Sequence, residues 1–327
     1  MDRIVTLSAA ERSDLFRETA ARLGATPAVA EKDFWVTWVL GRLFADAELS
    51  RLLLFKGGTS LSKVYRVIER FSEDIDLILD WRTVTGEDPQ ADRSNTAQAK
   101  LNKAIEADAQ AYIARELLPR VTAILGGHCT CGIATGDPHV IDIHYPAAFP
   151  DRYLRPELRL EIGPLAAWLP HQEGVIRSYA AEHFPSVFAA PSATVRVIRA
   201  ERTFWEKATI LHHEAHRPAG SVQPSRYSRH YYDLARLATS PIKAAALADR
   251  DLLDEVVAFK QRFYPRPWAR YDLACPGSLR LVPEREVLNT VRTDYAAMAN
   301  MIFGETPSFD EIIATLITLE TEINELT

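Results

Sequence analysis

The stretch LLLFKGGTSLSKVYRVIERFSEDIDLIL, at residues 52–79, decides the fold of this chain. An apolar run at residues 52–55 predicts a strand, and the glycine pair Gly57 and Gly58 follows it after a single lysine. A short helical segment comes next, and the alternating sequence at residues 75–79 predicts a second strand. The unit therefore has the order strand, glycine turn, helix, strand.

Two aspartates, Asp74 and Asp76, stand at the start of the second strand. Because successive side chains of a strand point to opposite faces, these two carboxylates share one face. Neighbouring carboxylates repel each other unless a cation lies between them, and such oxygen ligands suit Mg²⁺ together with substrate phosphates. We therefore predict that Asp74 and Asp76 are catalytic metal ligands.

The glycine turn supplies a complementary feature, because it joins an apolar strand to the start of a helix. Glycines let backbone N–H groups approach a phosphate closely, and a helix start adds partial positive charge. Ser72 lies two residues before Asp74 and is expected to point into the same site. The candidate nucleotide- and phosphate-binding residues are Gly57, Gly58, Thr59, Ser60, Lys63 and Ser72. The layout favours phosphoryl or nucleotidyl transfer, and the alternative is a tight turn before a solvated acidic strand.

Two segments, FKGGTSLSKVY at residues 55–65 and FSEDIDL at residues 71–77, carry a family resemblance. A glycine–hydroxyl turn followed by Asp-x-Asp resembles the nucleotidyltransferase core of the DNA-polymerase-beta superfamily. More narrowly, the two segments are similar to the AbiEii/AbiGii-like (MenT-like) family of toxin nucleotidyltransferases. The resemblance implies an α+β fold, in which a nucleotidyltransferase-fold domain with a mixed sheet is followed by a helical domain.

The resemblance extends to charged residues outside the central stretch. One of them is the run Glu31-Lys32-Asp33 before an aromatic residue. These residues could be the acidic start of a helix, or they could shape the nucleotide pocket. Lys207 on a helix and Asp233 in a Tyr-Asp-Leu context match two later motifs. The resemblance implies that both are catalytic, Lys207 as a phosphate ligand and Asp233 as a carboxylate that orients the lysine or the base.

Members of the superfamily often have a third carboxylate from a neighbouring strand. Glu161, in the alternating sequence RLEIG, is the candidate for a third metal ligand, and Asp142 is the runner-up. Either carboxylate could instead be a solvated strand residue.

The resemblance also implies an activity, the transfer of NMP from an NTP substrate to an RNA acceptor such as a tRNA 3′ end, with Mg²⁺. The chain would be the toxin of a type IV, AbiE-like toxin–antitoxin system, and its partner would be an AbiEi-like antitoxin. Three alternatives stay open: a small-molecule nucleotidyltransferase, a protein phosphotransferase that uses the same site, with Ser72 as one target, and a non-enzymatic binding protein. The preferred NTP and the oligomeric state are open as well.

The composition narrows the class of protein. The chain has 327 residues, enough for about two domains, and we expect a boundary between 1–194 and 195–327. A net charge of −6 argues against a protein that coats nucleic acid. Three cysteines are too few and odd in number for a disulfide framework. Without a long apolar run or a signal peptide, the expected location is the cytoplasm, with no membrane partner.

Periodicity and capping residues predict the other elements. Helices are expected over 8–23, 28–44 and 98–124, and strands over 140–145 and 158–162. Residues 164–191 are expected to be a connector with one short helix. The second half is expected to be helical over 200–216, 229–238, 242–264, 285–301 and 309–326.

Two histidine-containing clusters raise the alternative of a zinc site. His212 and His216 are four residues apart with Glu214 between them, but the order is not His-Glu-x-x-His. The group His128, Cys129, Cys131 and His139 has a Cys-x-Cys spacing that is too short for ordinary structural zinc. Mg²⁺ at the paired aspartates is therefore the favoured metal.

Overall fold

The computed structural model describes residues 1–151, 154–218, 220–298, 301–304 and 306–326. It divides into two units: the first comprises Met1–Arg66 and Phe71–Ile198, and the second comprises Val67–Arg70 and Arg199–Thr327. The expected boundary between residues 194 and 195 falls inside a strand, Ser192–Ile198, and the units divide at its end. Val67–Arg70, from the middle of the decisive stretch, belongs to the second unit.

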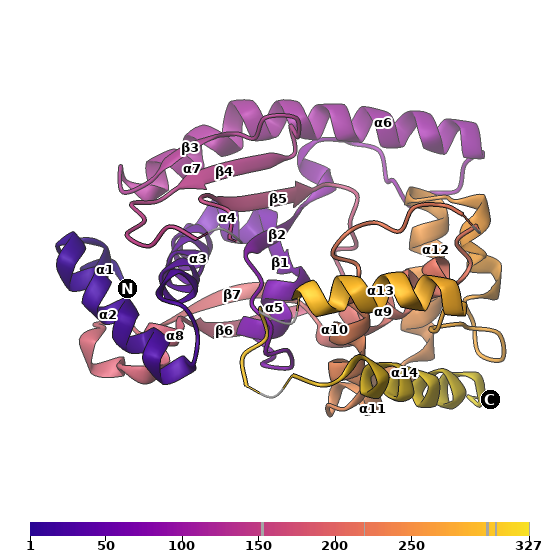
Figure 1. Cartoon of the computed structure of the whole chain (residues 1–327). Coiled ribbons are helices and arrows are strands. Elements are labelled where there is room, and N and C mark those ends of the chain that lie inside the picture. Colours follow the sequence, from indigo (N-terminus) through magenta and orange to yellow (C-terminus); the bar gives the residue numbers. More distant parts are fainter. Residues whose placement is uncertain (152–153, 219, 299–300, 305, 327) are drawn as a thin grey trace. The chain divides into compact units, whose positions relative to one another are not determined.

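A seven-stranded mixed sheet, in the order β3-β4-β5-β2-β1-β7-β6, forms the centre of the first unit (Figure 1). Its central strand β2 pairs antiparallel with β1 and parallel with β5. The α+β fold with a mixed sheet followed by a helical part is therefore confirmed. The strands are β1 (Leu53–Lys56), β2 (Asp74–Leu79), β3 (Thr130–Ile133), β4 (Val140–His144), β5 (Leu158–Gly163), β6 (His171–Arg177) and β7 (Ser192–Ile198).

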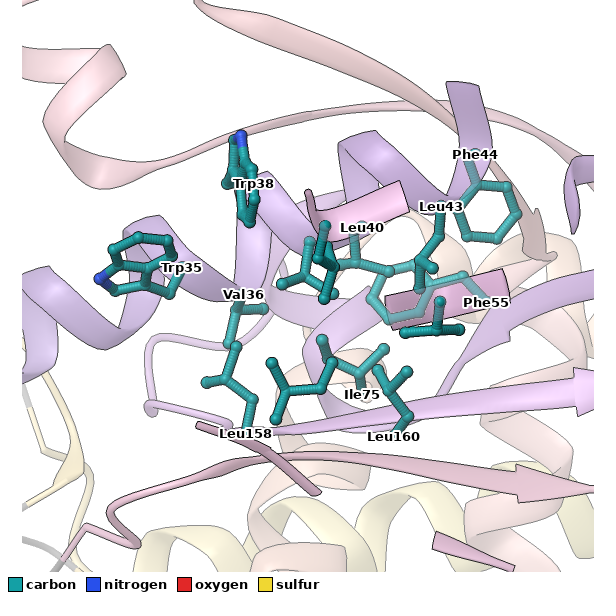
Figure 2. Packing of buried hydrophobic residues seen from close by; sticks show 14 of the residues in the cluster. Trp35, Val36, Trp38, Leu40, Leu43, Phe44, Phe55, Ile75, Leu158 and Leu160 are labelled. Atoms are coloured by element: carbon teal, nitrogen blue, oxygen red, sulfur yellow. The ribbon is translucent and has the colours of Figure 1, made fainter. Parts of the chain in front are cut away.

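The core of the first unit lies between this sheet and α3 (Pro27–Ala45). Figure 2 shows Val36 and Leu40 of α3 facing Phe55 of β1 and Ile75 of β2. Ile75, Leu77 and Leu79 of β2 all belong to this core. Their partners in the alternation, Asp74 and Asp76, therefore lie on the opposite face of the sheet.

Further helices surround this core. The helix α2 (Ala9–Leu23) begins with the capping box that the sequence predicts, in which Ser8 and Glu11 bond each other's backbone N–H. The remaining α-helices described in the first unit are α1 (Asp2–Val5), α4 (Ala47–Leu52), α5 (Gly57–Lys63), α6 (Asn95–Tyr112), α7 (Leu118–Leu125) and α8 (Tyr179–His183).

Two predictions in the first unit were wrong in detail. The single helix expected over 98–124 is interrupted by a π-helical turn, Ile113–Leu117. Pro119, just inside α7, has no N–H to donate to the carbonyl four residues earlier, so the hydrogen-bond ladder shifts there. The connector expected over 164–191 contains β6, an edge strand whose mostly exposed side chains have little apolar signal.

The second unit is helical around α9 (Ala200–Ala215) and α10 (Ser228–Ala238). The single helix expected over 242–264 is two helices, α11 (Ile242–Ala248) and α12 (Arg250–Phe263). Asp249 leaves helical geometry and caps α12 by accepting from Leu252 N–H. The last helices are α13 (Arg285–Met298) and α14 (Phe309–Asn324). Among the described residues, no helix combines the length and apolar character required to span a bilayer.

Candidate functional site

Asp74 and Asp76 are half-buried and lie on the face of β2 that points away from the core beneath α3. The sheet register places Asp76 beside Lys56 of β1 and beside Glu161 of β5. Asp74 lies in the next row, beside Arg159 of β5. One face of the sheet thus has two rows of charged residues around the paired aspartates.

Asp74 carries the clearest sign of a cation site. Its Oδ1 atom is buried and has no hydrogen-bond partner among the described residues. A buried carboxylate oxygen without a donor is unfavourable, and an Mg²⁺ ion would satisfy it. The described residues contain no cluster of three or more His, Cys, Asp or Glu that could hold a metal. An ion held by Asp74 and Asp76 would take its other ligands from substrate phosphates and water.

The two candidates for a third carboxylate lie at different distances along the sheet. Glu161 is the direct neighbour of Asp76, and its Oε1 is 3.3 Å from Nη1 of Arg159. Asp142 lies one strand further away, on β4, where Arg159 is 3.7 Å from its Oδ1. Burial raises the pKa of Asp142. The register therefore favours Glu161, although metal binding by either residue stays a prediction.

The helix α5 begins at Gly57 and lies against the aspartates. Gly57 has φ +80°, and a Cβ atom built on it would lie 2.6 Å from Cγ of Asp76. The hydroxyl of Thr59 donates to the carbonyl oxygen of Asp74 at 2.5 Å and to that of Ser72 at 3.3 Å. Ser60 donates to the carbonyl of Gly57 at 2.8 Å. The Thr59 hydroxyl therefore holds the turn against β2, and the Ser60 hydroxyl bonds within the turn. Phosphate binding stays a prediction for Gly57, Gly58, Thr59, Ser60 and Ser72.

Lys63, the last residue of α5, is buried and forms an ion pair with Asp33 of α3. Its ammonium also lies 3.5 Å from the ring centroid of Tyr179 and donates to the carbonyl of Arg177 at 3.3 Å. Burial by itself would lower the pKa of Lys63, but Asp33, Tyr179 and Glu182 together outweigh burial and raise the pKa. The cation is held by a carboxylate of its own unit, and phosphate binding by Lys63 stays a prediction.

Residues 31–33 of α3 form contacts that the sequence left undecided. All three side chains are at most 1% exposed. Lys32 Nζ is 2.7 Å from Oε2 of Glu73, the residue before Asp74, and donates to the carbonyl of Arg155 at 2.7 Å. Glu31 accepts from the backbone N–H groups of residues 148 and 149. The available signal was three consecutive charges followed by residues 34–40, which are apolar except for Thr37. Charges next to such an apolar run are expected to be buried and paired.

In the second unit, Lys207 of α9 and Asp233 of α10 form an ion pair with Nζ 2.8 Å from Oδ2. Arg70, which the sequence reading missed, also binds Asp233 through Nε–Oδ1 at 2.7 Å and Nη2–Oδ2 at 2.8 Å. Burial would raise the pKa of Asp233, but Arg70 and Lys207 together lower it well below its ordinary value. Burial lowers the pKa of Lys207, against the opposing effect of Asp233. The predicted lysine and aspartate are thus in contact.

His230 completes this group. Its Nδ1 atom is 3.0 Å from Nζ of Lys207. Burial and the charge of Lys207 lower the pKa of His230 well below its ordinary value, so the ring is neutral and Nδ1 accepts a hydrogen bond from the ammonium. Two acceptors, Asp233 and His230, therefore fix the position of the Lys207 ammonium.

The zinc alternative is not supported in either cluster. His212 uses both ring nitrogens inside the protein: Nε2 donates to the carbonyl of Arg270 at 2.9 Å, and Nδ1 accepts from Arg280 N–H at 3.0 Å. Burial raises the pKa of Cys129 to about 12, which disfavours the thiolate that zinc requires.

Comparisons with known proteins identify the family and the fold. Residues 38–315 match the family described as "Nucleotidyl transferase AbiEii toxin, Type IV TA system". The solved structures that resemble the chain include MenT4, a nucleotidyltransferase toxin from Mycobacterium tuberculosis H37Rv. That match has a TM-score of 0.52 and 16% sequence identity, and it covers 96% of this chain and 90% of MenT4. No curated protein sequence matches the chain.

The structural likeness shows the nucleotidyltransferase-toxin fold, and the family match covers most of the chain. The chain therefore belongs to the AbiEii family of nucleotidyltransferase toxins of type IV toxin–antitoxin systems.

Proposed function

We propose that this chain is a Mg²⁺-dependent enzyme that transfers NMP from an NTP to the 3′ end of an RNA, with tRNA as the acceptor. The observation that carries the proposal is the buried Oδ1 of Asp74, which has no hydrogen-bond partner among the described residues. Asp76 stands two residues further on the same strand face, which gives the pair of oxygen ligands that an NTP-bound Mg²⁺ requires.

The residues of the first unit have distinct roles in this proposal. Asp74 and Asp76 hold Mg²⁺, with Glu161 beside Asp76 as a supporting carboxylate. A bound Mg²⁺ would neutralise negative charge on the NTP phosphates and on the leaving pyrophosphate, and it would lower the pKa of an attacking hydroxyl. The backbone amides of Gly57 and Gly58 orient the phosphates, because only glycine allows such a close approach.

For the second unit, we keep Lys207 as a proposed phosphate ligand because it matches a later motif of the family. Asp233 is shared between Arg70 and Lys207, so it neutralises the charge of Lys207 only in part. Asp233 and His230 act as positioning residues, because they hold the ammonium in one place.

The partners follow from the family and from the resemblance of the sequence. Membership of a type IV toxin–antitoxin family supports an antitoxin partner, and we propose one of the AbiEi type. MenT4 is itself named a nucleotidyltransferase toxin. A net charge of −6 makes the chain poorly suited to coating a long nucleic acid, so the proposed acceptor is an RNA end and not a long duplex.

The test is a transfer assay with purified protein, Mg²⁺, total tRNA and each α-labelled NTP in turn. We expect one NTP to label tRNA, and Asp74→Asn and Asp76→Asn each to reduce the rate by about a thousandfold, in line with the loss of a principal electrostatic group. Asp108→Asn, an exposed carboxylate of α6, is the matched control and is expected to keep the wild-type rate.

Each other outcome of the assay points to a different activity. Label on a small molecule in place of tRNA would contradict the RNA acceptor while keeping the metal site. Label from γ-labelled NTP on the protein alone would indicate a phosphotransferase. Nucleotide binding that is unaffected by Mg²⁺ and by both aspartate variants would contradict enzymatic function.

A further inference from the structure

We propose that the buried ion pair between Lys32 and Glu73 is a positioning device for Asp74. The proposal rests on the metal-binding role proposed above and adds two residues to it. Lys32 lies on α3, and Glu73 is joined to Asp74 by a peptide bond. The pair therefore connects the rigid helix of the core to the first metal-binding residue of β2.

The contacts around Glu73 leave it little freedom. Lys32 Nζ lies 2.7 Å from Glu73 Oε2, and the two side chains are 1% and 4% exposed. The N–H of Arg155 donates to the same oxygen at 3.1 Å, and Lys32 in turn donates to the carbonyl of Arg155 at 2.7 Å. Lys32, Glu73 and the backbone of Arg155 are thus each hydrogen-bonded to the other two, at a point shortly before β2 and β5 begin.

A second contact holds Asp74 from the side of α5. The adjacent helix residue, Asp33, pairs with Lys63 at the end of α5. Within α5, the hydroxyl of Thr59 donates to the carbonyl oxygen of Asp74 at 2.5 Å. Two consecutive residues of α3 therefore fix the backbone of Asp74 through two separate routes, one through Glu73 and one through α5.

The stability of the fold does not by itself require a buried ion pair between Lys32 and Glu73. A buried ion pair can often be replaced by apolar side chains of similar volume without loss of stability, because the cost of desolvating two charges offsets their attraction. Its hydrogen bonds are directional, however, and an apolar pair would not impose that direction. Residues that orient metal ligands typically change metal affinity or activity by about ten- to a hundredfold when they are lost.

The double variant Lys32→Met/Glu73→Met separates positioning from stability, because it removes both charges together and leaves neither one buried alone. Mn²⁺ serves as the probe, and its binding to the NTP-free protein is measured by electron paramagnetic resonance. We expect the double variant to melt close to the wild-type temperature and to bind Mn²⁺ about tenfold more weakly or worse. We also expect kcat to fall by a similar factor, with little change in KM for the NTP.

Two controls make the result specific. Glu214→Gln breaks a buried ion pair with Arg217 in the second unit, so it is expected to lower the melting temperature and to leave Mn²⁺ affinity unchanged. Asp74→Asn is expected to abolish the strong Mn²⁺ site. If Asp74→Asn binds Mn²⁺ like the wild type, the proposed metal site itself is wrong.

Wild-type Mn²⁺ affinity in a folded double variant, with Asp74→Asn deficient, would overturn the positioning role alone. If the double variant does not fold, Glu73→Asp replaces it, since this change keeps the charge pair and shortens the link to Asp74 by one methylene. We expect at least about a threefold loss of Mn²⁺ affinity in Glu73→Asp, below the range for complete loss of an orienting residue. Unchanged affinity there would equally overturn the proposal.

Discussion

The Cα atom of Gly57 faces the carboxylate of Asp76 so closely that a Cβ atom on Gly57 would lie 2.6 Å from Asp76 Cγ. This contact joins the glycine turn to β2, the strand that carries the proposed metal ligands, and it leaves no room for a side chain at residue 57. It also explains why a glycine at residue 57, with φ +80°, precedes the Asp-x-Asp sequence.

Gly57→Ala is therefore expected to displace the Asp76 carboxylate and to reduce nucleotide transfer by about a hundredfold, the effect of a misplacement near 1 Å. The measurement is kcat/KM for the labelled NTP. Gly127→Ala is the matched control, because Gly127 also has a positive φ, +76°, but nothing lies within 4 Å of its added Cβ. Equal losses of activity in both variants would show that backbone strain, and not contact with Asp76, is responsible.

Mg²⁺ is expected to stabilise the wild-type fold even without NTP. At a tenfold excess over its dissociation constant, a ligand that binds only the folded state adds about 1.4 kcal/mol to the free energy of unfolding. Asp74→Asn should abolish this increment, and it should leave the metal-free protein at least as stable, since two neighbouring carboxylates repel each other. Urea unfolding with Mg²⁺ or with EDTA measures both effects, and an Mg²⁺ increment retained in the variant would contradict the site.

Asp233→Asn is expected to reduce the free energy of unfolding by about 3–5 kcal/mol, because it leaves two buried cations without their shared carboxylate. Lys207→Met should cost less, since Arg70 still pairs with Asp233 through two hydrogen bonds. Urea unfolding followed by the tryptophan signal measures both variants. Asp272→Asn, which breaks an exposed pair with Arg270, is the control and should have no measurable effect. A smaller loss in Asp233→Asn than in Lys207→Met would contradict the sharing of Asp233.

The buried His212 should make stability depend on pH. Burial lowers the pKa of His212 from 6.5 to about 4 in the folded state, so the unfolded chain takes up the proton first. The stabilisation is complete above pH 6.5 and is lost as the pH falls toward 4, by up to about 3 kcal/mol. His212→Gln should flatten this part of the curve of unfolding free energy against pH. A curve that keeps its full slope between pH 6.5 and 4 in His212→Gln would refute the assignment to His212.

Much of the candidate site follows from short-range sequence patterns. Strand alternation places Asp74 and Asp76 on one face wherever β2 lies in the sheet. The capping box at Ser8 and Glu11 likewise sets a helix start from local hydrogen bonds alone. The sequence did not predict elements that lack an apolar pattern. An example is the edge strand β6, whose residues are mostly exposed.

The sequence by itself determined the order strand, glycine turn, helix and Asp-x-Asp strand, and with it the class of chemistry. Only the tertiary structure decided which charges meet: Lys32 with Glu73, Lys63 with Asp33, and Arg70 with Asp233. The reason is physical, because alternation and capping act between neighbours along the chain. Buried charges instead select partners from 30 to 163 residues away, as packing excludes water and makes an unpaired charge too costly to retain.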